Sequence, residues 1–127
     1  MVKRGAEVCV ALSVYGIPSC GTVKKALVWL EAQRIPAEFV DFRATPPTRA
    51  QVSAWVAAFG DRAMRNTSGG SYRALPADKD AWDTARWIDA FTADPMLIKR
   101  PVIERDGTAV QVGFRGTDDE LKSTLTA

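Results

Sequence analysis

Residues 8–42, VCVALSVYGIPSCGTVKKALVWLEAQRIPAEFVDF, decide the fold. Residues 8–15 are β-rich and largely apolar, as expected of a strand buried on both faces. Gly and Pro interrupt the pattern at 16–21. From about residue 22 the apolar side chains recur at helical spacing, and Pro36 is expected to stop this helix. Residues 37–42 then predict a second strand. Such a βαβ unit implies a right-handed crossover and two parallel strands.

The next fifty residues predict helices. Thr48 and Gln51 form a capping-box signature that opens a helix ending at Gly60. Residues 66–71, with two adjacent glycines, predict a mobile loop rather than a phosphate cradle, because no strand precedes them. A further helix is predicted over 80–92. Its inward side chains are expected to be Ala81, Ala85, Ile88 and Phe91.

The last part of the chain predicts a hairpin and a helix. Residues 101–103 and 108–112 flank Asp106-Gly107, a favoured hairpin turn, although a longer turn also fits. Thr117 and Glu120 suggest a second capping box. The order predicts one α/β domain over residues 1–127. It has a thioredoxin-like βαβ–ββα core, with a helical segment inserted at about 46–95.

Composition excludes several classes of protein. The 127 residues carry 17 Lys and Arg against 15 Asp and Glu, and this net charge of +2 does not predict nucleic-acid binding. No run reaches the roughly 20 apolar residues of a membrane span. The apolar run 8–14 continues into Tyr15 without a cleavage pattern, so we expect a cytoplasmic protein. With no His and two Cys, neither a His-dependent triad nor a structural metal site is expected.

Cys20 is the candidate nucleophile. It follows a strand and a tight Gly-Ile-Pro loop, about two residues before the first helical turn. There the amides around Gly21 and Thr22 and the helix dipole favour an anion. Lys24 adds a cation if its side chain folds back toward the helix start. Such settings lower thiol pKa values to about 3.5–7.5. The alternative is a small buried apolar side chain.

The second cysteine, Cys9, is expected in the core. It lies roughly 20 Å from the end of the first strand, whereas a disulfide needs Cα atoms within about 7 Å. A Cys-X-X-Cys pair is absent, because Ile17 and Val23 stand three residues either side of Cys20. Ala26 excludes a phosphatase-type Cys-X5-Arg loop. A resolving thiol must therefore come from another molecule.

Three blocks carry a family resemblance: YGIPSCGTVKKA (15–26), PMLIKRPV (95–102) and VGF (112–114). In this order and spacing they resemble the ArsC/Spx/YffB group, and most closely its YffB branch. The resemblance implies a thioredoxin-like fold with inserted helices, a catalytic cysteine at Cys20 and glutathione as thiol partner. That fold places a cis-proline against the cysteine, so we expect a cis bond before Pro101 with Arg100 beside Cys20.

Glutaredoxin-coupled arsenate reductases of this group place three arginines around the cysteine. Arg100 matches one, and its planar guanidinium suits an oxyanion or a carboxylate, although a surface salt bridge is the alternative. The second falls at Arg65 or Asn66. The third falls at Phe114, and Arg115 beside it is expected to point to the opposite face of a strand. The YffB branch also has a loop arginine, where this chain has Ser68.

The sequence therefore predicts a glutathione-dependent thiol reductase. Its expected site comprises Cys20 with Gly21, Thr22, Lys24, Arg65, Arg100 and Pro101, and no bound cofactor or metal. The expected partners are glutathione or glutaredoxin, with a disulfide or a small oxyanion as substrate. The alternatives are a glutaredoxin-coupled arsenate reductase and an Spx-like regulator that binds RNA polymerase. The missing Cys-X-X-Cys switch argues against the latter.

Overall fold

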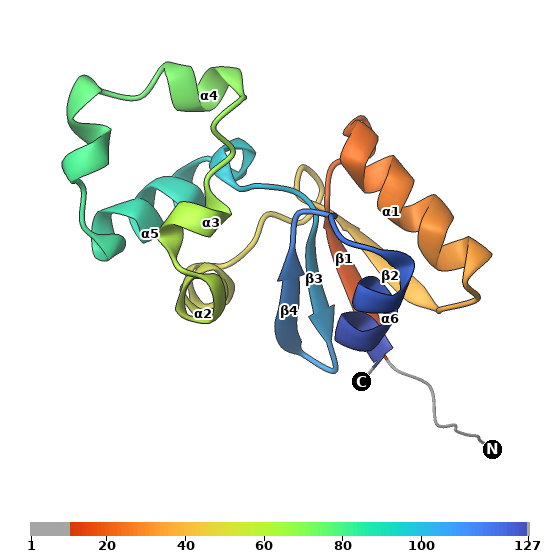
Figure 1. The fold of residues 1–127 in the computed structure, drawn as a ribbon. Helices are drawn as coiled ribbons and strands as arrows, with labels where there is room; N and C mark the ends of the chain where they lie inside the picture. Colours follow the sequence, from red (N-terminus) through yellow and green to blue (C-terminus); the bar gives the residue numbers. More distant parts are fainter. Residues whose placement is uncertain (1–10, 127) are drawn as a thin grey trace.

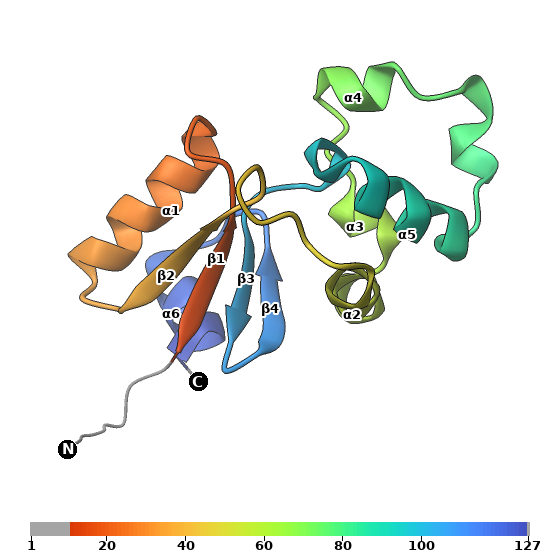
Figure 2. The same cartoon turned by 180° about the vertical axis from the view of Figure 1, so that it is seen from behind.

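The fold is given by a computed structural model that describes residues 11–126 (Figures 1 and 2). In chain order the elements are β1 (Leu12–Gly16), α1 (Gly21–Ala32), β2 (Ala37–Asp41), α2 (Arg49–Phe59), α3 (Asp61–Met64), α4 (Gly70–Arg73), a 3₁₀ turn (Ala77–Ala81), α5 (Thr84–Ala93), a second 3₁₀ turn (Pro95–Leu97), β3 (Val102–Arg105), β4 (Thr108–Val112) and α6 (Asp118–Thr126). The predicted start of the first strand and Cys9 lie outside the described residues.

The four strands form one mixed sheet in the order β2-β1-β3-β4. Strand β1 runs parallel to β2 and antiparallel to β3, and β3 pairs antiparallel with β4. The hairpin turn consists of Asp106 and Gly107 alone. Their φ angles of 52° and 83° are both positive, as in the favoured two-residue turn. The predicted α/β class and thioredoxin-like βαβ–ββα core are confirmed.

Helices cover both faces of the sheet, because successive strand residues point to opposite sides. Helices α1 and α6 lie on one face, and the inserted helices begin with α2 on the other (Figures 1 and 2). Two separate apolar clusters result. Leu12, Val14, Leu30, Ile103 and Leu125 are buried on the first face. Tyr15, Phe42, Trp55, Val56, Trp87, Phe91 and Val102 are among the residues buried on the second.

Both capping boxes are confirmed, and each holds the start of its helix. The Thr48 hydroxyl accepts from the Gln51 amide at 3.1 Å, and the Gln51 side chain accepts from the Thr48 amide at 2.9 Å. Thr117 and Glu120 exchange the same two bonds before α6, at 2.8 and 3.2 Å.

Two predicted boundaries in the insertion are wrong. Helix α5 starts at Thr84, not residue 80, because the Asp83 carboxylate accepts from the Arg86 amide at 2.8 Å and caps it there. The inward face of α5 is therefore centred on Trp87 and Phe91, one helical turn apart, while Ala85 is exposed. The predicted loop over 66–71 is also shorter, because α4 begins at Gly70.

Helix α1 packs closely against the end of β1. A Cβ atom on Gly16 would lie 2.6 Å from Cγ2 of Val23, which is fully buried and has a stiff β-branched side chain. Glycine at position 16 therefore lets the helix that carries Cys20 approach the sheet.

This contact predicts a non-additive pair of substitutions. We expect Gly16→Ala to lower the free energy of unfolding by about 1–3 kcal/mol through overpacking, and Val23→Ala by about 2 kcal/mol. In the double variant the new methyl group occupies the space that Val23 leaves. The combined loss should then be smaller than the sum by about 1 kcal/mol in urea unfolding.

Gly21→Ala is the matched control, because a Cβ there would have no atom within 4 Å. It should leave the free energy of unfolding unchanged or slightly raised. Equal stability of Gly16→Ala and the unsubstituted protein would contradict the close contact.

Candidate functional site

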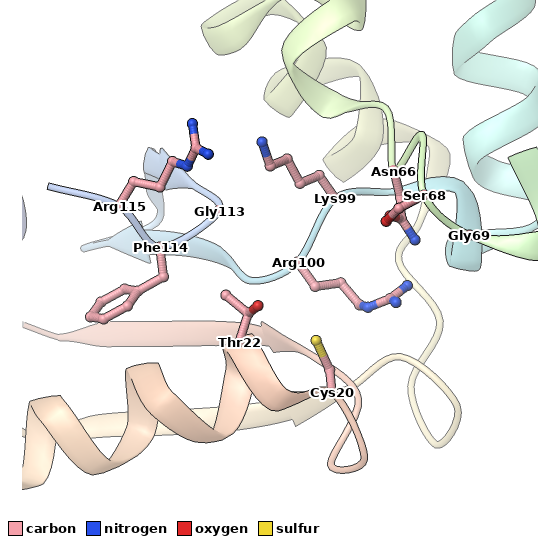
Figure 3. Close-up of a pocket in the computed structure, with 10 residues that line it drawn as sticks. All are labelled: Cys20, Thr22, Asn66, Ser68, Gly69, Lys99, Arg100, Gly113, Phe114 and Arg115. Carbon is pink, nitrogen blue, oxygen red and sulfur yellow. The ribbon is translucent and has the colours of Figure 1, made fainter.

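Four segments of the chain enclose a pocket of about 490 Å³ (Figure 3). Its lining residues come from the start of α1, the loop before α4, the segment before β3 and the segment after β4: Cys20, Thr22, Asn66, Ser68, Gly69, Lys99, Arg100, Gly113, Phe114 and Arg115. Three of these residues are cationic and none is acidic. The pocket is therefore suited to an anion.

Within residues 11–126, no group of three or more Cys, Asp or Glu side chains is arranged to hold a metal ion. No helix in this part of the chain is long and apolar enough to cross a bilayer.

Cys20 is the residue that immediately precedes α1, so it stands nearer to the helix than predicted. Its backbone is extended, with φ −79° and ψ 124°, and its carbonyl accepts the first helical bond from the Lys24 amide at 3.0 Å. The thiol is half-buried and points into the pocket (Figure 3). In this position it faces the unpaired amides of the first helical turn.

The pKa of the Cys20 thiol lies below its ordinary value. Burial raises this pKa. Hydrogen bonds from the Val23 amide, the Arg100 side chain and the Thr22 amide, together with the Arg100 charge, lower it by more than burial raises it. The thiolate is therefore formed at a lower pH than in a free cysteine. A thiolate, rather than a thiol, is the nucleophile in cysteine chemistry.

Arg100 is held beside Cys20, as predicted. The peptide bond between Arg100 and Pro101 is cis, which confirms that expectation. The Arg100 guanidinium donates to the Met96 carbonyl at 3.3 Å, and the Asn66 side-chain amide donates to the same oxygen at 3.2 Å. One carbonyl thus positions two side chains of the pocket.

The prediction that Arg65 lies in the site is wrong, and the neighbouring Asn66 takes that place. The Arg65 side chain is only 9% exposed and donates to the Asp61 carboxylate at 2.6 Å. Its guanidinium also lies 4.1 Å above the Trp87 ring. A partly desolvated ion pair and a cation–π contact together hold Arg65 inside the insertion.

The prediction for Lys24 is also wrong. Lys24 is exposed on α1, outside the residues that line the pocket, and is not among the groups that lower the pKa of Cys20. The pocket's lysine is Lys99, which the sequence analysis did not select. The family block around residue 99 contained this residue, but only the fold shows which way its side chain points.

The segment after β4 corrects the expectation for Arg115. Strand β4 ends at Val112, and Gly113 has a φ of +75°, so strand alternation does not continue through the next two residues. Phe114 and Arg115 therefore both line the pocket. Phe114 also meets the Trp29 ring edge-on at 5.7 Å.

The site geometry predicts which cation controls Cys20. We expect Arg100→Met to raise the pKa of the Cys20 thiol toward its ordinary value, because it removes a hydrogen bond and a charge. Arg100→Lys keeps the charge and should raise the pKa less. The measurement is the rate of iodoacetamide alkylation against pH, mapped by mass spectrometry to the peptide that contains Cys20.

Lys24→Met is the matched control, since it removes one positive charge from the same helix outside the pocket. It should leave the alkylation profile unchanged. A shift in Lys24→Met as large as that in Arg100→Met would contradict the assignment.

Known proteins with similar sequences and structures share this architecture. A solved structure of a YffB protein is 34% identical, with a TM-score of 0.80, and the match covers 91% of this chain and 99% of that one. A possible arsenate reductase from Streptococcus mutans is 30% identical, with a TM-score of 0.77 over 87% of this chain and 97% of that one. The global transcriptional regulator Spx 1 of Lactococcus lactis is 26% identical over 90% of this chain and 88% of its own length.

A protein-family model also matches most of the chain. The model of the ArsC family covers residues 15–120, from the end of β1 to the first turn of α6. This range includes Cys20, Arg100 and every other residue that lines the pocket. The chain therefore belongs to the ArsC family.

Proposed function

We propose that this ArsC-family protein is a cytoplasmic, glutathione-dependent thiol reductase that acts through Cys20. The observation that carries the proposal is the half-buried Cys20 thiol, with its lowered pKa, beside Arg100 in a pocket of about 490 Å³. Pockets of about 300–1,000 Å³ hold small organic ligands. A cytoplasmic location agrees with the proposal, because a reducing compartment keeps such a thiol free.

The proposed reaction is thiol–disulfide exchange. The Cys20 thiolate attacks one sulfur of a disulfide R–S–S–R′, so that a Cys20–S–S–R bond forms, the S–S bond breaks and R′–S⁻ leaves. A glutathione thiolate then attacks the R sulfur, which forms R–S–S–glutathione and releases the Cys20 thiolate. Glutathione disulfide itself enters the first step when R and R′ are both glutathione.

The pocket meets the needs of glutathione with few groups. An extended tripeptide requires backbone contacts, and we assign these to the chain around Pro101. It also requires a cationic partner for a carboxylate, and we assign this role to Arg100. Its sulfur must also reach Cys20. Among the described residues, the Arg100 guanidinium donates through Nη1 to the Met96 carbonyl and sulfur and also hydrogen-bonds the Cys20 sulfur. A guanidinium has five N–H donors, so others remain for a ligand.

Arsenate reduction coupled to glutaredoxin is the second candidate, and one observation favours it. The pocket holds Lys99 and Arg115 in addition to Arg100, so it carries more positive charge than the apolar Phe114 suggested. In Figure 3, however, the Lys99 and Arg115 side chains point toward each other and not toward the sulfur of Cys20. An oxyanion at that sulfur would therefore meet Arg100 and the first amides of α1, with no second guanidinium.

This ranking predicts a mixed disulfide in preference to arsenate turnover. After incubation with glutathione disulfide, intact mass spectrometry should show one glutathione adduct, which Cys20→Ser abolishes. Each missing charge-assisted hydrogen bond costs an oxyanion about 1.5–3 kcal/mol, or roughly ten- to a hundredfold in affinity. Arsenate reduction with glutaredoxin should therefore be weak or undetectable.

Cys9→Ser is the control that should keep the adduct. Robust arsenate reduction without any adduct would reverse the order of the two candidates. Co-precipitation of the RNA polymerase α subunit, with neither activity present, would instead support the Spx-like alternative.

A further inference from the structure

The pocket has positively charged side chains at two separate ends. Arg100 extends past Cys20 toward Asn66, whereas the Lys99 and Arg115 side chains converge at the other end (Figure 3). The proposed exchange at Cys20 uses Arg100 and the start of α1, and it leaves Lys99 and Arg115 without a role.

Lys99 and Arg115 have no acidic partner within residues 11–126. The salt bridges among these residues join Arg49 to Asp89 and Arg65 to Asp61. Three carboxylates stand in the first turn of α6. Asp118 accepts from the Trp29 indole at 2.9 Å, Glu120 accepts from the Thr117 amide at 2.8 Å, and no ion pair joins Asp119 to either cation. The two cations are therefore available to an anion from outside.

The backbone keeps space for this pair. Gly113 is buried with a φ of +75°, and a Cβ there would lie 3.1 Å from Cε of Lys99. A larger residue at 113 would therefore crowd the lysine stem that lies along the pocket. The Lys99 backbone is fixed as well, because its amide donates to the Met64 carbonyl at 2.7 Å.

We propose that Lys99 and Arg115 form a subsite for an anionic group that the substrate carries away from its reacting sulfur. This inference rests on the proposed thiol–disulfide exchange at Cys20 and specifies its substrate class: small thiols and disulfides with a remote carboxylate or similar anion. Glutathione, with a carboxylate at each end, belongs to this class. Neutral and cationic thiols of equal size do not.

Three small disulfides that differ mainly in charge test the subsite. They are 3,3′-dithiodipropionate with carboxylates, 2-hydroxyethyl disulfide with neutral hydroxyls, and cystamine with ammonium groups. The rate of Cys20 mixed-disulfide formation is measured by intact mass and divided by the rate for a free small thiol, which removes intrinsic reactivity. We expect the anionic disulfide to have the highest normalised rate and cystamine the lowest.

The double variant Lys99→Met/Arg115→Met should lower the normalised rate with the anionic disulfide about tenfold or more, because two charge-assisted contacts are lost. The rate with the neutral disulfide should change less than about twofold. The matched control, Arg62→Met/Lys122→Met, removes the same net charge from exposed positions outside the pocket and should leave both rates unchanged.

The outcomes separate this inference from the proposed function. If no disulfide forms an adduct with the unsubstituted protein, the proposed function fails and the subsite with it. If all three form adducts with no charge preference, or if the control variant lowers the anionic rate equally, the subsite alone is overturned.

Rates of the unsubstituted protein in rising salt give a test that needs no variant. The anionic rate should fall while the neutral rate stays constant.

Discussion

The site depends on a short antiparallel pairing between the inserted segment and the chain that enters β3. The Lys99 amide donates to the Met64 carbonyl at 2.7 Å, and the Asn66 amide donates to the Leu97 carbonyl at 2.8 Å. Ile98, between them, is fully buried. The two bonds lie on either side of the bridge between Arg65 and Ile98. They therefore bring the loop before α4 against the segment that carries Arg100, and both line the pocket.

A polar cluster behind this pairing holds the insertion in place. The Asp61 carboxylate accepts from both Arg65 and Thr84, which belong to different parts of the insertion. On the sheet side, Glu104 accepts from the Tyr15 hydroxyl at 3.0 Å and from the Trp55 indole at 2.8 Å. These bonds connect α2 to β1 and β3, so both clusters support the position of the pocket between the sheet and the insertion.

Features set by adjacent residues could be predicted from the sequence, and those set by distant contacts could not. Cys20 at a helix start is a local pattern, as are the capping boxes and the Asp-Gly turn, whereas the cis bond after Arg100 was expected from the family resemblance. The choice of Asn66 over Arg65 depends on Trp87 and Asp61, which only the fold brings together. Arg115 was misplaced because strand alternation was extended beyond the residue where the strand ends.

The placement of the aromatic side chains has an optical consequence. Three of the four tryptophans, at positions 55, 82 and 87, belong to the inserted segment, and two of them have no exposed surface. The fourth, Trp29, lies against Phe114 at the edge of the pocket. Indole emission therefore comes mainly from the insertion. Detachment of the insertion from the sheet would change this tryptophan fluorescence, so no added label is needed to follow it. A protein that retains only Trp29 would instead emit from beside the pocket.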